Sequence, residues 1–245
     1  MKRLLNLLLA MLLLLVPARA ESVDVEAMQR ARDALNRQGF SISDECFARA
    51  LEYRRTMQEM YAWSGFDAGN PEQSELIYEL LLCEGIGVYD YDALTWTPTS
   101  EQIYVFDAEF FNVEGMYTEF LQGVQSIMPD AQITDVREDL SGMNEYLEGK
   151  RKVLFEFNGH SYVVTLTSEG DWLNTEIIDF LNQVLKTEGD TNRLHIVSEG
   201  WDQLVFLIYG TEADAKALRR LLDVEEPASS VGESLLDWLG SLFGQ

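Results

Sequence analysis

The hydrophobic pattern of this 245-residue chain changes its period at about residue 100. Before this point apolar residues recur every three or four positions, a spacing that predicts amphipathic helices. Beyond it, helical segments are interspersed with short runs typical of β-strands, whose successive side chains point to opposite faces. The change therefore predicts an α+β protein in which a helical N-terminal region precedes a mixed, mostly antiparallel sheet with packed helices.

Three helices are expected within residues 21–98. Each has a polar residue that can cap its start and a glycine that can end it: Ser22 and Gly39, Ser43 and Gly65, Asn70 and Gly85. A stretch rich in glycine, tyrosine, aspartate and threonine follows up to residue 100, without a sustained period. We therefore expect residues 21–98 to form a helical region that ends in an acidic and aromatic connector.

The most specific local signal is the dipeptide Asn158-Gly159, which lies between segments 153–157 and 161–167. Asn and Gly tolerate the positive φ angles of a tight turn, so this pattern predicts a two-residue β-hairpin. The basic cluster Lys150-Arg151-Lys152 comes just before it. We interpret this cluster as the solvated edge of a sheet, where charge discourages pairing with other sheets.

A second pair of strands is expected at 193–197 and 204–209. Segment 204–209 is apolar throughout, which predicts a central strand covered on both faces. Because a helix follows each pair of strands, residues 99–224 contain two strand-strand-helix units and are predicted to form an α+β domain. The helix after the second pair is expected to begin with Thr211 as its cap.

The N-terminus has the features of a secretory signal peptide. Lys2 and Arg3 precede an apolar run from 4 to 16, and the small-residue pattern Ala18-Arg19-Ala20 follows. An uncleaved membrane anchor is the alternative, but the run is shorter than the ~20 residues that a spanning helix needs. We therefore expect residues 1–20 to be removed after Ala20. The mature protein would then lie outside the cytoplasm, secreted or periplasmic, without a transmembrane segment.

The composition excludes several classes of function. The chain has 42 acidic against 18 basic residues and a formal charge of −24, which argues against nucleic acid as a partner. Such acidity favours cationic peptides or divalent ions, although solubility alone is another reason for it. Two His and two Cys are too few for a three-histidine or four-thiolate zinc site, and we expect no metal centre and no cofactor.

The two cysteines, Cys46 and Cys83, lie on the apolar faces of two expected helices. Exported proteins meet oxidising conditions, and an even number of cysteines is typical of disulfide bonding there. The sequence therefore predicts a Cys46–Cys83 disulfide, with two buried free thiols as the alternative.

Common catalytic motifs such as G-x-S-x-G and H-E-x-x-H are absent from the chain. The best-placed acids for catalysis are Glu84, Asp90 and Asp92, at the end of the third helix and in the connector. A glycosidase needs two carboxylates with unequal pKa values, and nearby aromatic rings could stack on sugars. These rings belong to Tyr89, Tyr91 and Trp96. The alternative is that the same aromatic residues simply pack the connector against the rest of the protein.

The C-terminus, residues 225–245, is predicted to be a linker followed by a short amphipathic helix. Its apolar face consists of Leu235, Trp238, Leu239 and Leu242. Such a face must be covered, either by an unknown protein partner or a second copy, or by the chain's own domain.

Together these features favour a non-covalent binding or accessory role outside the cytoplasm, rather than an enzymatic one. A hydrolase acting on an extracellular polymer, or a structural or assembly component, are the alternatives.

Overall fold

The computed structural model describes residues 24–64, 71–90, 95–199 and 203–224. These residues form six helices and eight strands, which confirms the predicted α+β class. The strands do not form one mixed sheet, however. Within the described residues they form two separate three-stranded antiparallel sheets and a two-stranded hairpin. The predicted signal peptide and the C-terminal tail lie outside the described residues.

The N-terminal region contains the three expected helices. They are α2 (Val25–Arg37), α3 (Asp44–Ser64) and α4 (Gln73–Gly85). Ser43 caps α3 as predicted, because its Oγ accepts a hydrogen bond from the backbone N of Cys46 at 3.1 Å. Asp24, rather than Ser22, caps α2 through a 2.8 Å bond from the backbone N of Ala27. The prediction of Asn70 as the cap of α4 was also wrong, because the residue at the cap position of this helix is Glu72.

The connector after α4 has more regular structure than its sequence predicts. Strands β1 (Val88–Asp90) and β2 (Thr95–Thr97) pair antiparallel, with Tyr89 opposite Trp96. The short length of both strands explains why no period is visible in the sequence.

The central sheet has the order β3 (Ile103–Asp107), β8 (Leu204–Gly210) and β7 (Arg193–Glu199). Strand β8 is the middle strand and is buried on both sides, so the prediction of a covered central strand is confirmed. Alternate residues point into two different hydrophobic clusters. Phe206 and Ile208 join one cluster, and Val205 and Leu207 join the other.

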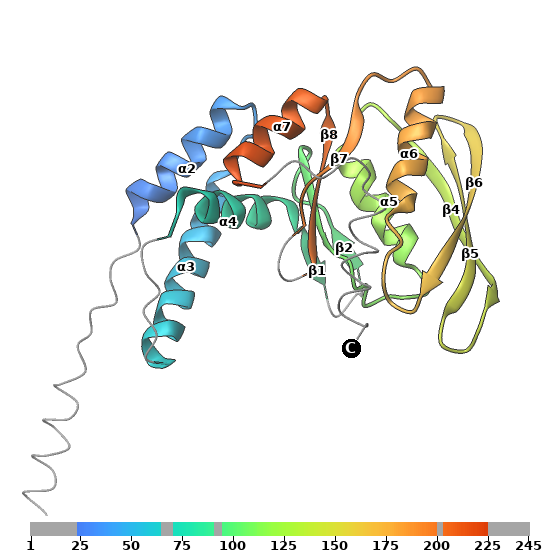
Figure 1. The fold of residues 1–245 in the computed structure, drawn as a ribbon, viewed down its shortest axis with the longest axis horizontal. Helices are drawn as coiled ribbons and strands as arrows, with labels where there is room; N and C mark the ends of the chain where they lie inside the picture. The colour runs from blue at the N-terminus through green and yellow to red at the C-terminus, as the bar shows by residue number, and fades with distance from the viewer. Residues whose placement is uncertain (1–23, 65–70, 91–94, 200–202, 225–245) are drawn as a thin grey trace, which may run out of the picture.

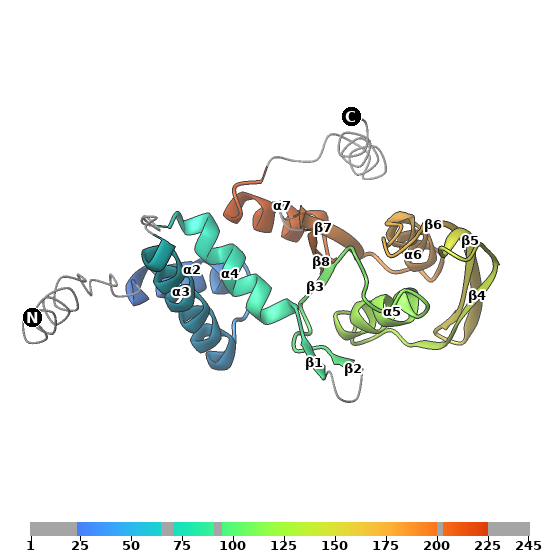
Figure 2. The ribbon, with the colours of Figure 1, turned by 90° about the horizontal axis from the view of Figure 1, so that it is seen from below.

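Helices α4 and α7 (Glu212–Leu221) cover one face of the central sheet, and α2 and α3 pack on α4 (Figures 1 and 2). Thr211 caps α7 as predicted and forms a capping box with Asp214. The N-terminal helices and the sheet therefore share a hydrophobic core.

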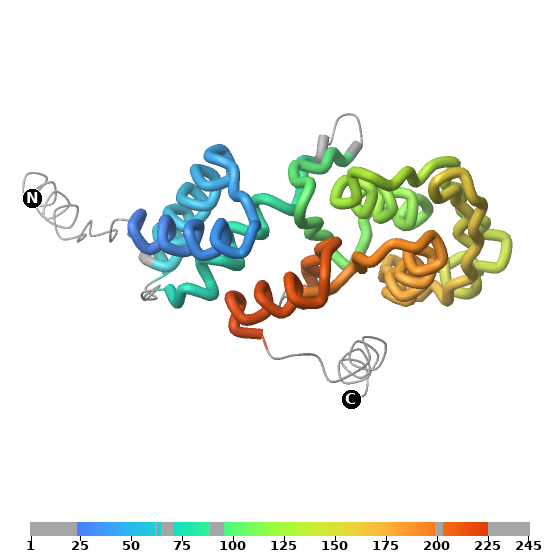
Figure 3. Tube along the Cα trace, turned by 90° about the horizontal axis from the view of Figure 1, so that it is seen from above, coloured from blue at the N-terminus to red at the C-terminus, as the bar shows by residue number. Residues whose placement is uncertain are grey.

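Helices α5 (Met116–Ser126) and α6 (Glu176–Thr187) lie between the central sheet and a second sheet. Figure 3 shows this arrangement along the long axis, from the N-terminal helices to the second sheet. The second sheet has the order β4 (Ile133–Met143), β5 (Glu148–Phe157) and β6 (His160–Glu169). Asn158 and Gly159 have φ angles of 51° and 82° and connect β5 to β6, which confirms the predicted hairpin.

The interpretation of Lys150-Arg151-Lys152 as a sheet edge was wrong, because β5 is the middle strand of its sheet. Arg151 is 0% exposed. Its Nη1 lies 2.9 Å from the Glu138 carboxylate and donates to the carbonyl of Val113 at 2.8 Å. Its guanidinium also lies over the Tyr117 ring, 5.4 Å from the centroid. A buried charge of this kind is tolerated only because it is paired.

The predicted Cys46–Cys83 disulfide was also wrong, since both thiols are free. The Cys46 thiol donates to the backbone carbonyl of Cys83 at 3.4 Å, so it is directed at the main chain and not at the other sulfur. Burial raises the pKa of the Cys46 thiol, and raises that of Cys83 to about 11, which keeps both protonated at neutral pH. The alternative of two free thiols is the one that the structure shows.

In the described part of the chain, no helix combines the length and the apolarity that crossing a membrane requires.

Candidate functional site

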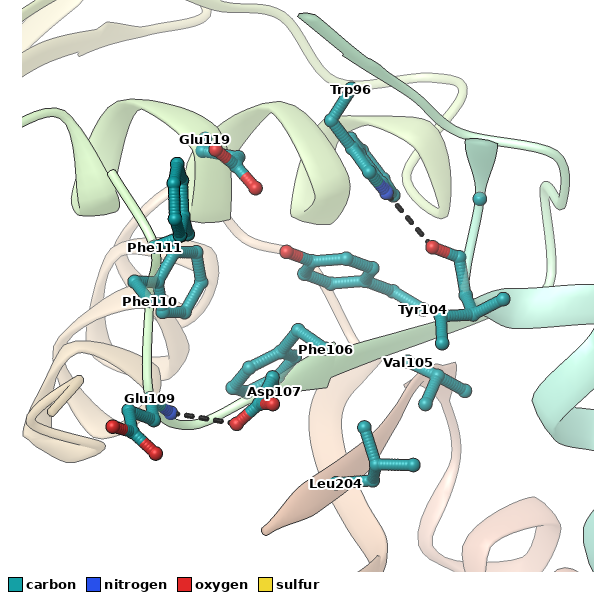
Figure 4. A pocket seen from close by; sticks show the side chains of 12 residues that line it. Trp96, Tyr104, Val105, Phe106, Asp107, Glu109, Phe110, Phe111, Glu119 and Leu204 are labelled. Carbon is teal, nitrogen blue, oxygen red and sulfur yellow. Dashed lines mark hydrogen bonds between the residues drawn. The ribbon is translucent and has the colours of Figure 1, made fainter. Parts of the chain in front are cut away.

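The candidate site is a pocket of about 430 Å³ beside β3, within the size range of small-molecule sites (Figure 4). Its walls come from the β1–β2 hairpin, from β3 and the loop after it, from α5 and from the start of β8. Because β3 is an edge strand of the central sheet, this side of the strand is available to a pocket. The residues that line it are Ile86, Gly87, Trp96, Tyr104, Val105, Phe106, Asp107, Glu109, Phe110, Phe111, Glu119 and Leu204.

Five aromatic side chains are among the residues that line the pocket. The ring of Tyr104 lies 5.2 Å from that of Trp96 and 5.1 Å from that of Phe106, between centroids. Phe106 in turn lies 6.1 Å from Phe110. These distances are those of favourable aromatic pairs, so four rings make a continuous wall. The fifth ring, Phe111, is 90% exposed at the rim.

Two glycines fix the positions of these rings. A Cβ at Gly123 of α5 would lie 2.2 Å from Cζ of Tyr104, and a Cβ at Gly87 would lie 2.5 Å from the Trp96 indole. Only glycine permits so close an approach, and Gly87 also has a φ of +73° that favours glycine. The indole Nε1 of Trp96 donates to the carbonyl of Ile86 at 2.8 Å, which fixes its orientation. The aromatic wall is therefore formed before any ligand binds.

The loop that carries the rim residues is also fixed by its backbone. The N–H of Phe110 donates to the carbonyl of Asp171 at 2.7 Å. Glu109 forms an isolated β-bridge with Trp172, and its own N–H donates to the Asp107 carboxylate at 2.9 Å. The rim of the pocket is thus tied to the segment that precedes α6.

Three carboxylates accompany the aromatic rings, those of Asp107, Glu109 and Glu119, and none of the described residues that line the pocket is a lysine, arginine or histidine. The Glu119 carboxylate is half-buried, and burial alone raises its pKa. It has no hydrogen bond or ion pair with any of the residues that the structure describes. The pocket is therefore apolar in its walls and negative in its charge.

The hydroxyl group of Tyr104 points into the same space as the Glu119 carboxylate (Figure 4). The Tyr104 side chain is only 2% exposed, and its hydroxyl makes no hydrogen bond within the described residues. Burial, followed by the nearby negative charge of Glu119, raises the pKa of Tyr104 well above its usual value. Because it has no protein partner among the described residues, this hydroxyl can form a hydrogen bond with a ligand or with water in the pocket.

Of the predicted site residues, the structure does not bring Glu84 to this pocket. Glu84 is buried at the end of α4, where its carboxylate accepts hydrogen bonds from the N and Oγ of Ser43 at 3.1 and 3.2 Å. Asp90 belongs to β1 by its backbone, opposite Thr95. Asp92 lies outside the described residues, as do Leu235, Trp238, Leu239 and Leu242 of the tail.

Trp96 is the one residue of the pocket that the sequence analysis considered. Tyr104, Asp107, Glu109 and Glu119 were missed. A signal for part of the pocket existed in the segment 104–111, Tyr-Val-Phe-Asp-Ala-Glu-Phe-Phe, which is unusually rich in aromatic and acidic residues. This segment alone does not predict that Glu119, on the next helix, lines the same pocket.

Comparisons of the chain with protein-family models, with curated proteins and with solved structures give no match. The functional assignment therefore depends on the chemistry of the pocket itself.

Proposed function

We propose that this protein is a non-covalent binding protein that acts outside the cytoplasm, and that the pocket beside β3 is its ligand site. The observation that carries the proposal is a preformed wall of aromatic rings with an unpartnered hydroxyl and carboxylate among them. Apolar pockets with a few convergent polar groups are the usual form of a ligand site. The location outside the cytoplasm is supported by the signal-peptide pattern of residues 1–20.

The fixed geometry of the wall favours binding. Ligand affinity is reduced by the entropy lost when loose side chains become ordered. Gly87 and Gly123 hold Trp96 and Tyr104 in place without a ligand, so little of this entropy would be lost on binding. The exposed ring of Phe111 adds apolar surface at the entrance that a ligand would cover.

The alternative of a polymer hydrolase has less support. Its central candidate, Glu84, uses its carboxylate to hold the start of α3 through Ser43, and it does not line the pocket. An assembly role through residues 231–245 is a prediction that concerns a segment outside the described residues.

The proposal is tested by fragment screening with two-dimensional amide NMR spectra of the protein. We expect aromatic fragments to shift the indole signal of Trp96 and the amide signals of residues 104–111. Phe111→Ala should weaken these fragments severalfold. The matched control is Trp63→Ala, which removes another exposed ring, 89% exposed on α3 and outside the pocket. Fragments that bind elsewhere, or that bind the Phe111→Ala protein equally well, would contradict the proposal.

A further inference from the structure

The charges of the pocket restrict the kind of ligand that it can take. Of the twelve described residues that line it, three are acidic and none is basic. The whole protein carries a formal charge of −24, so its field also repels anions. An anionic ligand would enter this pocket without any counter-charge and against repulsion. A cationic ligand would meet attraction from both sources.

The Glu119 carboxylate is the most informative of the three acids. It is half-buried, its pKa is raised by burial, it lines the pocket together with the aromatic rings, and it pairs with none of the described basic residues. Acidic side chains in such places are usually paired, because burial of an unpaired charge is unfavourable. A bound cation would supply the missing partner.

The aromatic rings and the Tyr104 hydroxyl suit the same kind of ligand. The faces of Trp and Tyr rings attract cations through their quadrupoles, and aromatic cages recognise ammonium groups in this way. The Tyr104 side chain is 2% exposed, its hydroxyl has no hydrogen-bond partner among the described residues, and its oxygen can accept a hydrogen bond from an N–H donor. Aromatic faces, hydroxyl and carboxylate thus converge on one space (Figure 4).

A metal ion fits this arrangement less well than an organic cation. Calcium requires six to eight oxygen ligands gathered around one point. Among the described residues, no group of three or more His, Cys, Asp or Glu side chains is arranged to hold a metal ion. The apolar rings would also contribute nothing to a hydrated divalent ion, whereas they would bury the stem of an amine.

We propose that the pocket binds organic cations, namely an ammonium group on an apolar or aromatic stem, with Glu119 as its counter-ion. This inference rests on the proposed binding function and specifies the ligand class. Two sources share this chemistry, a free amine and a lysine side chain of a peptide. Both would place the ammonium between the Tyr104 hydroxyl and the Glu119 carboxylate, and the stem on the aromatic wall.

The test uses three probes that share a phenylethyl group and differ in charge, titrated into the full chain and followed by amide NMR spectra. They are 2-phenylethylammonium, neutral 2-phenylethanol and anionic 3-phenylpropanoate. We expect the ammonium probe to bind about tenfold more tightly than the alcohol, and the anion to bind more weakly than both. The blocked dipeptide acetyl-Phe-Lys-amide separates the two sources, since tighter binding than 2-phenylethylammonium would favour a peptide lysine and weaker binding a free amine.

Two variants assign the selectivity to one residue. Glu119→Gln should weaken the ammonium probe about tenfold and leave 2-phenylethanol unchanged. Glu114→Gln is the matched control, because it changes the net charge by the same amount. Glu114 is exposed just before α5 and lies outside the pocket. Should Glu119→Gln fail to fold, salt gives a second measurement. Raising NaCl from 0.05 to 0.5 M should weaken the ammonium probe and not the alcohol.

The outcomes distinguish the inference from the function on which it rests. Equal binding of the three probes in the pocket would overturn cation recognition and leave the binding function standing. Equal losses in Glu119→Gln and Glu114→Gln would likewise overturn the role of Glu119. Pocket signals that no probe shifts would contradict both proposals.

Discussion

At the scale of single residues, the pocket depends on how closely two rings approach the backbone. Tyr104 lies flat against Gly123 of α5, and Trp96 lies against Gly87. In the second sheet, the buried side chain of Arg151 also depends on specific neighbours. It joins β5 to β4 through the Glu138 carboxylate and to the segment before α5 through the carbonyl of Val113. In each case one side chain requires a specific neighbour, which makes the positions testable by substitution.

Gly123→Ala is predicted to destabilise the protein by about 1–3 kcal/mol, the usual effect of overpacking a filled site. The added Cβ would lie 2.2 Å from the Tyr104 ring, so the ring must move out of the wall. Urea unfolding measures the loss. In the double variant with Tyr104→Leu, most of the additional cost of Gly123→Ala should disappear, because the clashing ring is gone. Purely additive effects would show that the two residues do not interact in this way.

Arg151→Met is predicted to destabilise the protein by about 3–5 kcal/mol, because it leaves the Glu138 carboxylate buried without its counter-charge. Adding Glu138→Leu should restore much of the loss. Lys152→Met is the control on the same strand, since its side chain is 54% exposed and its ion pair with Asp139 contributes little. Chemical denaturation compares the four proteins. Equal small losses in Arg151→Met and Lys152→Met would refute a structural role for the buried pair.

At the scale of secondary-structure elements, the sequence predicts best where local chemistry decides. The Asn158-Gly159 turn, the Ser43 cap and the Thr211 cap are local signals, and all three are confirmed. Strand β4 shows the opposite case. Only 133–136 has a strand pattern, but β4 extends to Met143 because β5 pairs with it across two register shifts.

The pocket could not be predicted for a related reason. Its walls come from a hairpin, a strand, a loop and a helix that are distant in the sequence, and no spacing connects Trp96 to Glu119. The disulfide prediction failed in the same way. The helical pattern places Cys46 and Cys83 on apolar faces but does not set the direction of one sulfur relative to the other.

The contact between α3 and α4 predicts a specific pH dependence. The Glu79 carboxylate lies there, 3.0 Å from Arg54, and burial outweighs this attraction and raises its pKa to about 7 from 4.5. Between these values the folded protein keeps a proton that the unfolded chain releases. The free energy of unfolding should therefore fall as the pH rises from about 4.5 to 7, with the Glu79 contribution complete below that window and lost above it.

Urea unfolding at several pH values between 5 and 8 measures this effect. Glu79→Gln should have a flatter profile than the unmodified protein, because glutamine does not titrate. Glu101→Gln, at an exposed position, should leave the slope as it is. Parallel profiles for the unmodified protein and Glu79→Gln would show that Glu79 does not titrate in this range.

At the scale of the whole molecule, the central sheet contributes residues to two hydrophobic clusters, one on each of its faces. Residues Ile103, Val105, Phe206 and Ile208 face the N-terminal helices and α7. The pocket lies on the edge of this sheet, so its geometry depends on a strand that the helices help to hold. The N-terminal helices thus support the candidate site without contributing to its aromatic wall.

A fragment of residues 99–224 is therefore predicted to lose cooperative unfolding, because it would expose the face of the sheet that α4 covers. Circular dichroism during heating, with the full chain as the reference, measures this loss. A fragment that unfolds cooperatively at the same temperature as the full chain would show that the helices are dispensable for the α+β domain.

A crystal structure with 2-phenylethylammonium would show directly whether the pocket beside β3 binds an organic cation. We expect its ring against Trp96 and Tyr104, and its ammonium within hydrogen-bond distance of the Glu119 carboxylate. An amine that occupies another site at saturating concentration, or whose ammonium points away from Glu119 into solvent, would refute cation binding by this pocket.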